Sequence, residues 1–433
     1  MKLIVNGGKK LSGNVVVKGA KNATTKMMVA SLLTKDAVKL RNFPIIGDTK
    51  ITGELCQAFG AKLMIDKNKS ELIIQTPEIT STQALNLTRK NRIPILAMGP
   101  LLARSKKAIV PILGGDKIGP RPVDLHINAL RSLGAEVTIF DDRYEATAPN
   151  GLKGAKIVFP FPSVGATENV ILASVLAKGR TVIENAAIEP EILDIIKLLQ
   201  KMGAIIGLGA NRTIYIEGVK ELHGAEHFIL PDRNEVVSFA VLSAVTNGEI
   251  KVLGAKQDDL ITFLNVFRKI GGGYRVKDDG ITFFKEKEFV GIELETDTHP
   301  GFMTDWQQPT VVLLTQAKGI SVIHETIYED RFAYTEDLNA MGADITVFSK
   351  CLGELNCRFN GKGYGHSAVI KGATPLSART LKVRDLRAGM AHLVATLMVN
   401  GSSEIDGVEE IDRGYEDLDN RLKKLGADIR REE

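Results

Sequence analysis

Six copies of one short pattern run through this chain of 433 residues. Each copy has a bulky apolar residue, a glycine, an alanine or a second glycine, one further residue and then a hydrophobic residue. Each follows a segment with helical periodicity and leads into an alternating or β-branched run that is typical of a strand. Because glycine adopts left-handed backbone conformations without a Cβ penalty, we expect it to end each helix. The copies begin at Phe59, Leu133, Met202, Ile270, Met341 and Leu425.

A second element recurs in phase with the first. It consists of an apolar helical segment, a polar or glycine turn and a strand, as in ASVLAKGRTVIENA and LSAVTNGEIKVLG. Six units of about 70 residues are long for solenoid repeats, so each is expected to be a compact α/β subdomain. Three units per domain give two domains of similar build, with a seam near residue 230, where a proline and a charged turn interrupt the pattern.

Composition narrows the classes of function. The net charge is only +4 and aromatic residues make up 6%, without the basic clusters and interleaved aromatics of nucleic-acid binders. No apolar run reaches the roughly 18 residues of a membrane span, and no signal peptide is visible. Cys56, Cys351 and Cys357 are too few for a disulfide framework, which favours a reducing, cytoplasmic setting. Neither HExxH nor CxxC occurs, so the sequence predicts no metal site.

One glycine-rich stretch, GGDKIGPRP at 114–122, lies between an apolar run and a helical segment. It is neither a dinucleotide-binding fingerprint nor a phosphate-binding Walker loop. An ordinary surface loop remains one interpretation. The other is a mobile lid, because the stretch places Asp116, Lys117 and Arg121 close together beside glycines that permit movement.

Several isolated charges are candidates for a site. Arginines and lysines near helix starts suit phosphates and carboxylates, because the paired N–H groups of a guanidinium and the backbone N–H groups of the helix can point at the same anion. Taken singly, each of these residues is as well explained as a solvated charge. Three carboxylates have an equally simple explanation, either as negative charges at a helix start or as partners of other charges. They are Glu189, Glu191 and Asp385. Asp305 is more suggestive as a base, because it lies in a glycine- and proline-rich loop beside Trp306. The cations are Lys21, Arg92, Arg331, Arg387 and Arg413.

Nine motifs, in order from end to end, resemble those of the UDP-N-acetylglucosamine enolpyruvyl transferases. A single motif would be a weak signal, whereas nine in family order over a six-fold repeat are specific. The motifs are GAKNA (19–23), GGDKIGPRPVDLH (114–126), PSVGATEN (162–169), ENAAIEPEI (184–192), PDR (231–233), HPGFMTDWQQP (299–309), YEDRF (328–332), RDLRAG (384–389) and IDRGYE (411–416).

The resemblance implies a fold of two inside-out α/β barrels, each built from three βαβαββ units. One domain would cover 21–230, with a mobile loop around 112–122, and the other would cover 1–20 and 231–433. Substrates would bind in the cleft and the domains would close over them. The implied enzyme transfers the enolpyruvyl group of phosphoenolpyruvate to the 3′-hydroxyl of UDP-N-acetylglucosamine and releases phosphate, the first committed step of peptidoglycan precursor synthesis. It would need no cofactor or metal, bind no nucleic acid or membrane, and be a monomer or weak oligomer.

The resemblance also implies residue roles. Asp305 would accept the proton of the sugar hydroxyl, and Asp116 would be the general acid for carbon 3 of phosphoenolpyruvate, with Lys21 and Arg413 completing the catalytic set. Phosphoenolpyruvate would be bound by Lys21, Arg92, Arg121, Arg331, Arg387 and Arg413. The sugar nucleotide would be bound by Asn22, Arg92, Arg121, Pro122, Val123, Asp124, Leu125, Ser163, Val164, Gly165, Asp305 and Ile327.

The chain departs from the family pattern at a few positions. Most members carry a cysteine where this chain has Asp116, and an aspartic acid can replace it as proton donor if burial raises its pKa. Fosfomycin, which alkylates that cysteine, should then fail to inactivate the protein. Phe161 stands where many members have a lysine near the nucleotide, and Val236 stands where a small polar residue is common. These changes weaken the prediction of the nucleotide contacts.

Two alternative functions remain open. A 5-enolpyruvylshikimate-3-phosphate synthase shares the architecture and phosphoenolpyruvate, but its entry motif has a serine-lysine-serine core, whereas this chain has Gly19-Ala20-Lys21-Asn22. A non-catalytic sugar-nucleotide-binding homologue is the second alternative. Phosphate release separates these alternatives, because a protein that only binds forms no phosphate.

Overall fold

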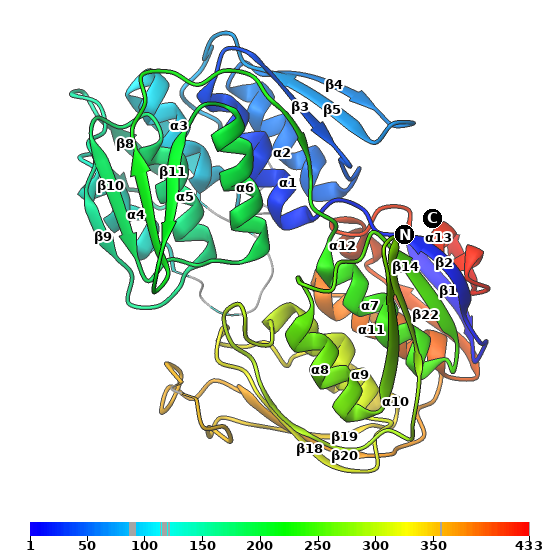
Figure 1. Cartoon of the computed structure of the whole chain (residues 1–433). Coiled ribbons are helices and arrows are strands. Elements are labelled where there is room, and N and C mark those ends of the chain that lie inside the picture. The colour runs from blue at the N-terminus through cyan, green and yellow to red at the C-terminus, as the bar shows by residue number, and fades with distance from the viewer. Residues whose placement is uncertain (86–91, 113, 115–118, 120–121, 356, 433) are drawn as a thin grey trace. The chain divides into compact units, whose positions relative to one another are not determined.

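The computed structural model describes residues 1–85, 92–112, 114, 119, 122–355 and 357–432. They form two compact units (Figure 1). Among the described residues, unit 1 holds 1–18, 119 and 231–432, and unit 2 holds 19–85, 92–112, 114 and 122–230. The predicted acid Asp116 and the predicted anion ligand Arg121 lie outside the described residues.

Unit 2 contains three sheets. Their strand orders are β13-β3-β5-β4, β11-β12-β10-β9 and β6-β8-β7. The strands are β3 (Ala37–Arg41), β4 (Lys62–Asp66), β5 (Glu71–Gln75), β6 (Lys107–Pro111), β7 (Glu136–Ile139), β8 (Arg143–Thr147), β9 (Lys156–Val158), β10 (Arg180–Glu184), β11 (Ile205–Gly209), β12 (Thr213–Glu217) and β13 (Glu226–Phe228).

Unit 1 also contains three sheets. Their orders are β15-β16-β14-β2, β17-β18-β20-β19 and β21-β22-β1-β23. The strands are β1 (Lys2–Gly7), β2 (Ser12–Val16), β14 (Glu249–Leu253), β15 (Gly272–Lys277), β16 (Gly280–Lys285), β17 (Glu293–Glu295), β18 (Gly319–His324), β19 (Asp344–Phe348), β20 (Ser367–Gly372), β21 (Thr380–Lys382), β22 (Gly401–Asp406) and β23 (Asp428–Glu432).

The sheets share one topology. In each four-stranded sheet, one edge strand pairs in parallel with its neighbour, and that neighbour pairs antiparallel with the other inner strand. For example, β9 pairs in parallel with β10, and β10 pairs antiparallel with β12. The chain segment from β9 to β12 reads βαβαββ, and the segments from β13 and from β17 repeat it. The predicted α/β class and repeat are therefore confirmed.

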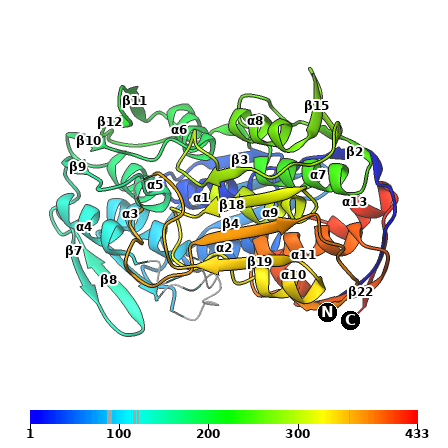
Figure 2. The same cartoon turned by 90° about the horizontal axis from the view of Figure 1, so that it is seen from below.

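Three helices occupy the interior of each unit (Figure 2). They are rich in apolar residues on every side, which is the pattern of a helix surrounded by protein. All 13 residues of α7 and all 8 of α9 are buried. In unit 2 the helices are α1 (Lys21–Ala30), α3 (Pro94–Ser105) and α5 (Val164–Ser174), and in unit 1 they are α7 (Arg233–Val245), α9 (Gln307–Leu314) and α11 (Leu386–Met398).

The second helix of each repeat ends at the glycine that the repeat pattern predicted. All six of these glycines have a positive φ, between 91° and 124°, where a Cβ would be strained, and a strand follows each one. The glycines are Gly60, Gly134, Gly203, Gly271, Gly342 and Gly426. These second helices are α2 (Gly47–Ala58), α4 (Asp124–Ser132), α6 (Pro190–Lys201), α8 (Ile261–Ile270), α10 (Thr335–Met341) and α13 (Leu418–Lys424). The structure also contains the short helices η1 (Ser31–Leu33), η2 (Thr304–Trp306) and α12 (Val408–Asp412).

Among the helices that the structure describes, none combines the length and the apolar character that a membrane crossing needs.

Candidate functional site

Predicted site residues lie at the N-terminal ends of the buried helices. Lys21 and Asn22 form the first turn of α1, and Arg92 stands just before α3. Ser163 caps α5, where its Oγ accepts a hydrogen bond from the Ala166 amide at 3.4 Å. The first amides of a helix lack partners within the helix and carry partial positive charge. These positions therefore suit anionic groups, as the sequence argument expected.

Lys21 is fixed by a carboxylate. Its Nζ lies 3.0 Å from Asp48 Oδ2, and Asp48 is buried in the first turn of α2. A lysine held in this way loses little further side-chain freedom when an anion arrives. No sequence motif singled out Asp48, which is 27 residues away from Lys21.

A buried charge cluster continues along α1. Lys26 Nζ lies 3.8 Å from Glu168 Oε1 of α5, and both side chains are almost fully buried. Burial raises the pKa of Glu168 to about 7, although the charge of Lys26 opposes the rise; Glu189 and Glu191 add to it. Sequence reasoning assigned Glu189 and Glu191 only to a helix start, whereas their charges also reach into this cluster.

His126 lies beside the predicted nucleotide contacts. Its Nδ1 is 3.2 Å from Asn169 Nδ2, and its ring approaches Gly165, where a Cβ would stand 3.1 Å from His126 Cε1. Burial lowers the pKa of His126 to about 3, and the charge of Arg92 lowers it further. The ring is therefore neutral, and Nδ1 accepts the hydrogen bond from Asn169.

The other predicted nucleotide residues are more open. Asp124 is the first residue of α4 and is exposed, as is Pro122. Val123 and Leu125 are half-buried and pack against the core of unit 2. Phe161 is exposed, so its side chain is available to a ligand in place of the family lysine.

In unit 1, Asp305 is bound by two arginines. Its Oδ1 lies 2.7 Å from Arg331 Nη2, and its Oδ2 lies 3.2 Å from Arg387 Nη2. Both guanidinium groups are buried. Burial by itself would lower the pKa of each, but the surrounding groups, Asp305 foremost, together outweigh it, so the pKa of each is raised. The structure thus brings together the predicted base and two predicted anion ligands.

Further residues position this group. The Asp385 side chain caps α11 and accepts from the Arg387 amide at 2.9 Å. Arg387 Nη1 also donates to the Tyr415 hydroxyl at 3.1 Å. Sequence reasoning treated Asp385 as a charge that could simply pair, and it did not identify Tyr415.

The buried Glu325 orders the loop on each side of Asp305. Its Oε2 accepts from Thr304 Oγ1 at 2.9 Å, and its Oε1 accepts from the amide of Ile327, a predicted nucleotide contact, at 2.8 Å. Burial raises the pKa of this carboxyl group. No motif in the sequence singled out Glu325.

Arg413 follows α12 directly. Its Nη1 donates to Glu410 Oε2 at 2.7 Å. The side chain is buried, so this predicted cation is held in place by a neighbour three residues earlier in the chain.

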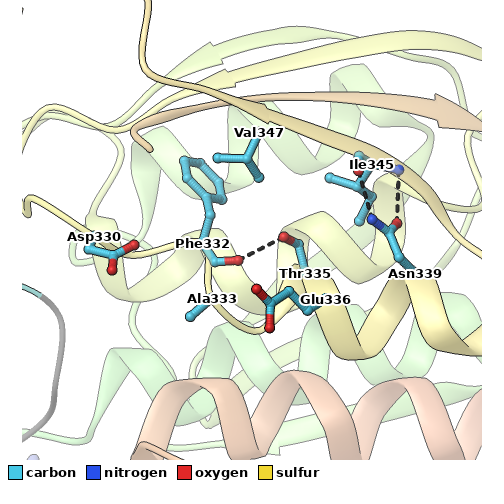
Figure 3. Close-up of a pocket in the computed structure, with 8 residues that line it drawn as sticks. All are labelled: Asp330, Phe332, Ala333, Thr335, Glu336, Asn339, Ile345 and Val347. Carbon is cyan, nitrogen blue, oxygen red and sulfur yellow. Dashed lines mark hydrogen bonds between the residues drawn. The ribbon is translucent and has the colours of Figure 1, made fainter. Parts of the chain in front are cut away.

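A hollow of about 330 Å³ lies between α10 and β19 (Figure 3). None of the predicted site residues lines it. Its lining carries two carboxylates and no cation, so it does not suit an anionic substrate. The lining residues are Asp330, Phe332, Ala333, Thr335, Glu336, Asn339, Ile345 and Val347.

The chain is similar to known enolpyruvyl transferases. Residues 5–422 match the family model of EPSP synthase (3-phosphoshikimate 1-carboxyvinyltransferase). A UDP-N-acetylglucosamine 1-carboxyvinyltransferase of Protochlamydia amoebophila is 49% identical over 434 residues, covering 99% of this chain and 93% of the relative. The enzyme of that name from Gluconobacter oxydans is 38% identical and covers 99% of both chains.

Solved structures agree in fold. The enolpyruvyl transferase NikO from Streptomyces tendae superposes with a TM-score of 0.87 at 22% identity, over 99% of this chain and 98% of that one. An EPSP synthase from Acinetobacter baumannii gives a TM-score of 0.73 at 18% identity, over 99% of this chain and 100% of its own.

Proposed function

This chain belongs to the EPSP synthase (3-phosphoshikimate 1-carboxyvinyltransferase) family, and on that premise we propose that it transfers the enolpyruvyl group of phosphoenolpyruvate to the 3′-hydroxyl of UDP-N-acetylglucosamine. The observation that carries the proposal is the identity of nearly one half, over the whole chain, with relatives that bear this activity in their name. Likeness to the synthase acting on shikimate-3-phosphate is far weaker, at 18% identity. The proposal therefore makes the protein an enzyme of peptidoglycan precursor synthesis.

The reaction can be written with groups that this chain carries. The sugar oxygen bonds to carbon 2 of phosphoenolpyruvate as Asp305 takes the hydroxyl proton and carbon 3 gains one from Asp116. The resulting tetrahedral adduct still bears the phosphate. Carbon 3 then loses a proton, the bond from carbon 2 to the phosphate oxygen breaks, and the double bond is restored. No net oxidation occurs, so acid–base groups and anion ligands supply the chemistry.

The arginine pair explains how Asp305 could become a proton acceptor only when phosphoenolpyruvate binds. The two guanidinium groups occupy both carboxylate oxygens of Asp305. A phosphate or carboxylate of phosphoenolpyruvate would compete for Arg331 and Arg387, because both form strong charge-assisted hydrogen bonds with anions. Binding of that substrate would thereby free Asp305 to accept a proton.

The remaining roles are part of the same proposal. In unit 2, Asn22 and the segments 122–125 and 163–165 would bind the sugar nucleotide, and Lys21 and Arg92 would bind anionic groups. Ile327 and Arg413 would contribute from unit 1. A cytoplasmic location belongs to the proposal as well, since the three cysteines are free thiols.

Phosphate release from the purified protein tests the proposal. Phosphoenolpyruvate would be supplied with UDP-N-acetylglucosamine, with shikimate-3-phosphate or with no acceptor. We expect release only with the sugar nucleotide. Release with shikimate-3-phosphate would assign the chain to the sister reaction, and no release with either acceptor would indicate a binding protein.

Asp305→Asn provides the test of the base. The amide keeps the size of the side chain but cannot accept the proton, so we expect kcat to fall on the order of 10²–10⁴-fold. Asp279→Asn is the matched control, because Asp279 is an exposed aspartate of the same unit that pairs with Lys251 at 2.6 Å. Equal activity of the two variants would remove Asp305 from the catalytic role.

Fosfomycin tests the assignment of Asp116. A carboxyl group in place of the family cysteine lacks the thiolate that the inhibitor alkylates. We expect phosphate release to be unchanged after prolonged incubation with fosfomycin. Time-dependent inactivation of the purified protein would contradict this assignment.

A further inference from the structure

Two histidines and two cysteines meet in unit 1, away from the residues assigned to the reaction. His324 ends β18, and the other three belong to the connection between β19 and β20 and its end. The ligand atoms of the four side chains all lie within 4.8 Å of one another. Both histidines are buried and both cysteines are half-buried, so the cluster lies at the edge of the core with its cysteine side toward solvent. Its members are His324, Cys351, Cys357 and His366.

The two imidazole rings are oriented in the same way. Nδ1 of His324 lies 2.8 Å from Ser367 Oγ, and Nδ1 of His366 lies 2.7 Å from the Tyr364 carbonyl oxygen. A carbonyl oxygen only accepts, so it fixes the proton of His366 on Nδ1 and leaves Nε2 with a lone pair. Histidines that bind metals commonly have one ring nitrogen held by a hydrogen bond while the other is the ligand atom.

One of these nitrogens has no partner. Among the residues that the structure describes, Nε2 of His324 is buried without a hydrogen bond. A buried polar atom without a partner is uncommon, and a bound ion is one of its ordinary explanations. The unsatisfied atom belongs to a ring whose centroid lies 5.3 Å from that of the second imidazole, His366.

The sulfur atoms complete the set. Cys351 Sγ lies 3.3 Å from His366 Nε2, and Cys357 Sγ accepts a hydrogen bond from the Phe359 amide at 3.4 Å. Both thiols are free rather than joined in a disulfide. The amide bond fixes the orientation of the Cys357 side chain, as hydrogen bonds around metal ligands commonly do.

We propose that His324, Cys351, Cys357 and His366 bind one zinc ion. Two sulfur and two nitrogen ligands are a typical set for tetrahedral zinc, and four protein ligands leave no open position for catalysis. Zinc–ligand bonds of about 2.0–2.3 Å place the ligand atoms of a tetrahedron roughly 3.3–3.8 Å apart. The cluster needs only a small contraction to reach that size. The site is therefore structural.

The ion would fasten the β19–β20 connection to the strand that leads to Glu325. Glu325 follows His324 directly, and its amide donates to the His366 carbonyl oxygen at 2.7 Å. Its carboxylate in turn holds Thr304, next to Asp305. A Cβ at Gly353 would stand 2.8 Å from His324 Cδ2, so the connection passes close over the ligand ring. Zinc would thus position Asp305 through Glu325 and would not touch the substrate.

The sequence predicted no metal site because it contains neither CxxC nor HExxH. The two cysteines are six positions apart and the two histidines are 42 positions apart. Short-range spacing cannot reveal such a site, because the pairing of β18 with β20 brings its parts together.

Metal analysis of the full chain tests the proposal without reference to its activity. The protein would be purified under reducing conditions without chelators and analysed by plasma mass spectrometry. We expect about one zinc ion per chain in the wild type, and a loss of that zinc in Cys351→Ser and in Cys357→Ser. Cys56→Ala is the matched control, because Cys56 is a buried cysteine in α2 of unit 2. It should retain the zinc.

Cobalt provides a second readout that does not depend on the cysteine variants folding. Reduced, metal-free wild type titrated with Co²⁺ should develop the absorption bands of tetrahedral cobalt and of cobalt–thiolate bonds. Ser367→Ala removes the partner of His324 Nδ1 and should weaken zinc binding roughly 10–100-fold. The proposal is overturned if the reduced wild type binds neither zinc nor cobalt, if binding persists in both serine variants, or if Cys351 and Cys357 form a disulfide under reducing conditions.

Discussion

Replacing His126 with asparagine should make the protein less sensitive to mild acid. The pKa of the buried ring is lowered to about 3, from an ordinary value of 6.5. As the pH falls below 6.5, His126 takes up a proton in the unfolded chain but stays neutral in the folded chain. The stabilising contribution is therefore complete above pH 6.5 and is lost progressively as the pH falls towards 3.

The size of the effect follows from this difference in pKa. Each pH unit between the two values corresponds to about 1.4 kcal/mol. At pH 5 the loss is roughly 2 kcal/mol, and its upper limit near pH 3 is about 5 kcal/mol. For a unit of roughly 200 residues, 2 kcal/mol corresponds to a shift in Tm of about 4–8 °C.

His126→Asn keeps the one hydrogen bond that the ring makes. The side-chain oxygen of asparagine can accept from Asn169 Nδ2, which now lies 3.2 Å from His126 Nδ1, but it does not titrate. The assay is thermal unfolding at pH 7 and pH 5 at constant ionic strength. The Tm of the wild type should fall about 4–8 °C further than that of the variant.

His223→Asn is the control, because that histidine is exposed. It should behave as the wild type does at both pH values. An equal fall in Tm for wild type and His126→Asn would refute the reasoning, since burial would then not keep the proton from the ring.

Two further predictions concern buried charges. Arg421 donates to both carboxylate oxygens of Glu235, at 2.9 and 2.7 Å. Arg421→Met would leave this buried carboxylate without its charged partner, so we expect urea titrations to show a free energy of unfolding lower by roughly 3–5 kcal/mol. An unchanged urea midpoint would contradict this. The pKa of Glu168 is raised to about 7, so its contribution is complete below pH 4.5 and is lost as the pH rises through 7. Between pH 5 and pH 8, the Tm of Glu168→Gln should therefore fall less than the Tm of the wild type. An equal fall in Tm would argue against a protonated Glu168.

The sequence determined the fold to a large extent. The six glycines were predicted to end helices, and all six have the left-handed conformation that such an end requires. Six α/β units also followed from the sequence, because helical and strand periodicities are local, whereas the βαβαββ order within them came from the family resemblance.

The candidate site was determined only in part. The sequence placed Lys21, Asn22 and Arg92 near helix starts and singled out Asp305, but it could not show that Asp305 contacts Arg331 and Arg387, which are 26 and 82 positions away. Glu325 and Tyr415 carried no local signal, since their roles depend on burial and on partners brought by other elements.

The histidine–cysteine cluster was decided by tertiary structure alone. Its ligands come from the end of β18 and from the long connection between β19 and β20, and only the antiparallel pairing of β18 with β20 makes His324 and the connection neighbours. Local sequence sets the conformation of each element, whereas the protonation and metal-binding capacity of a side chain depend on the groups that packing places around it.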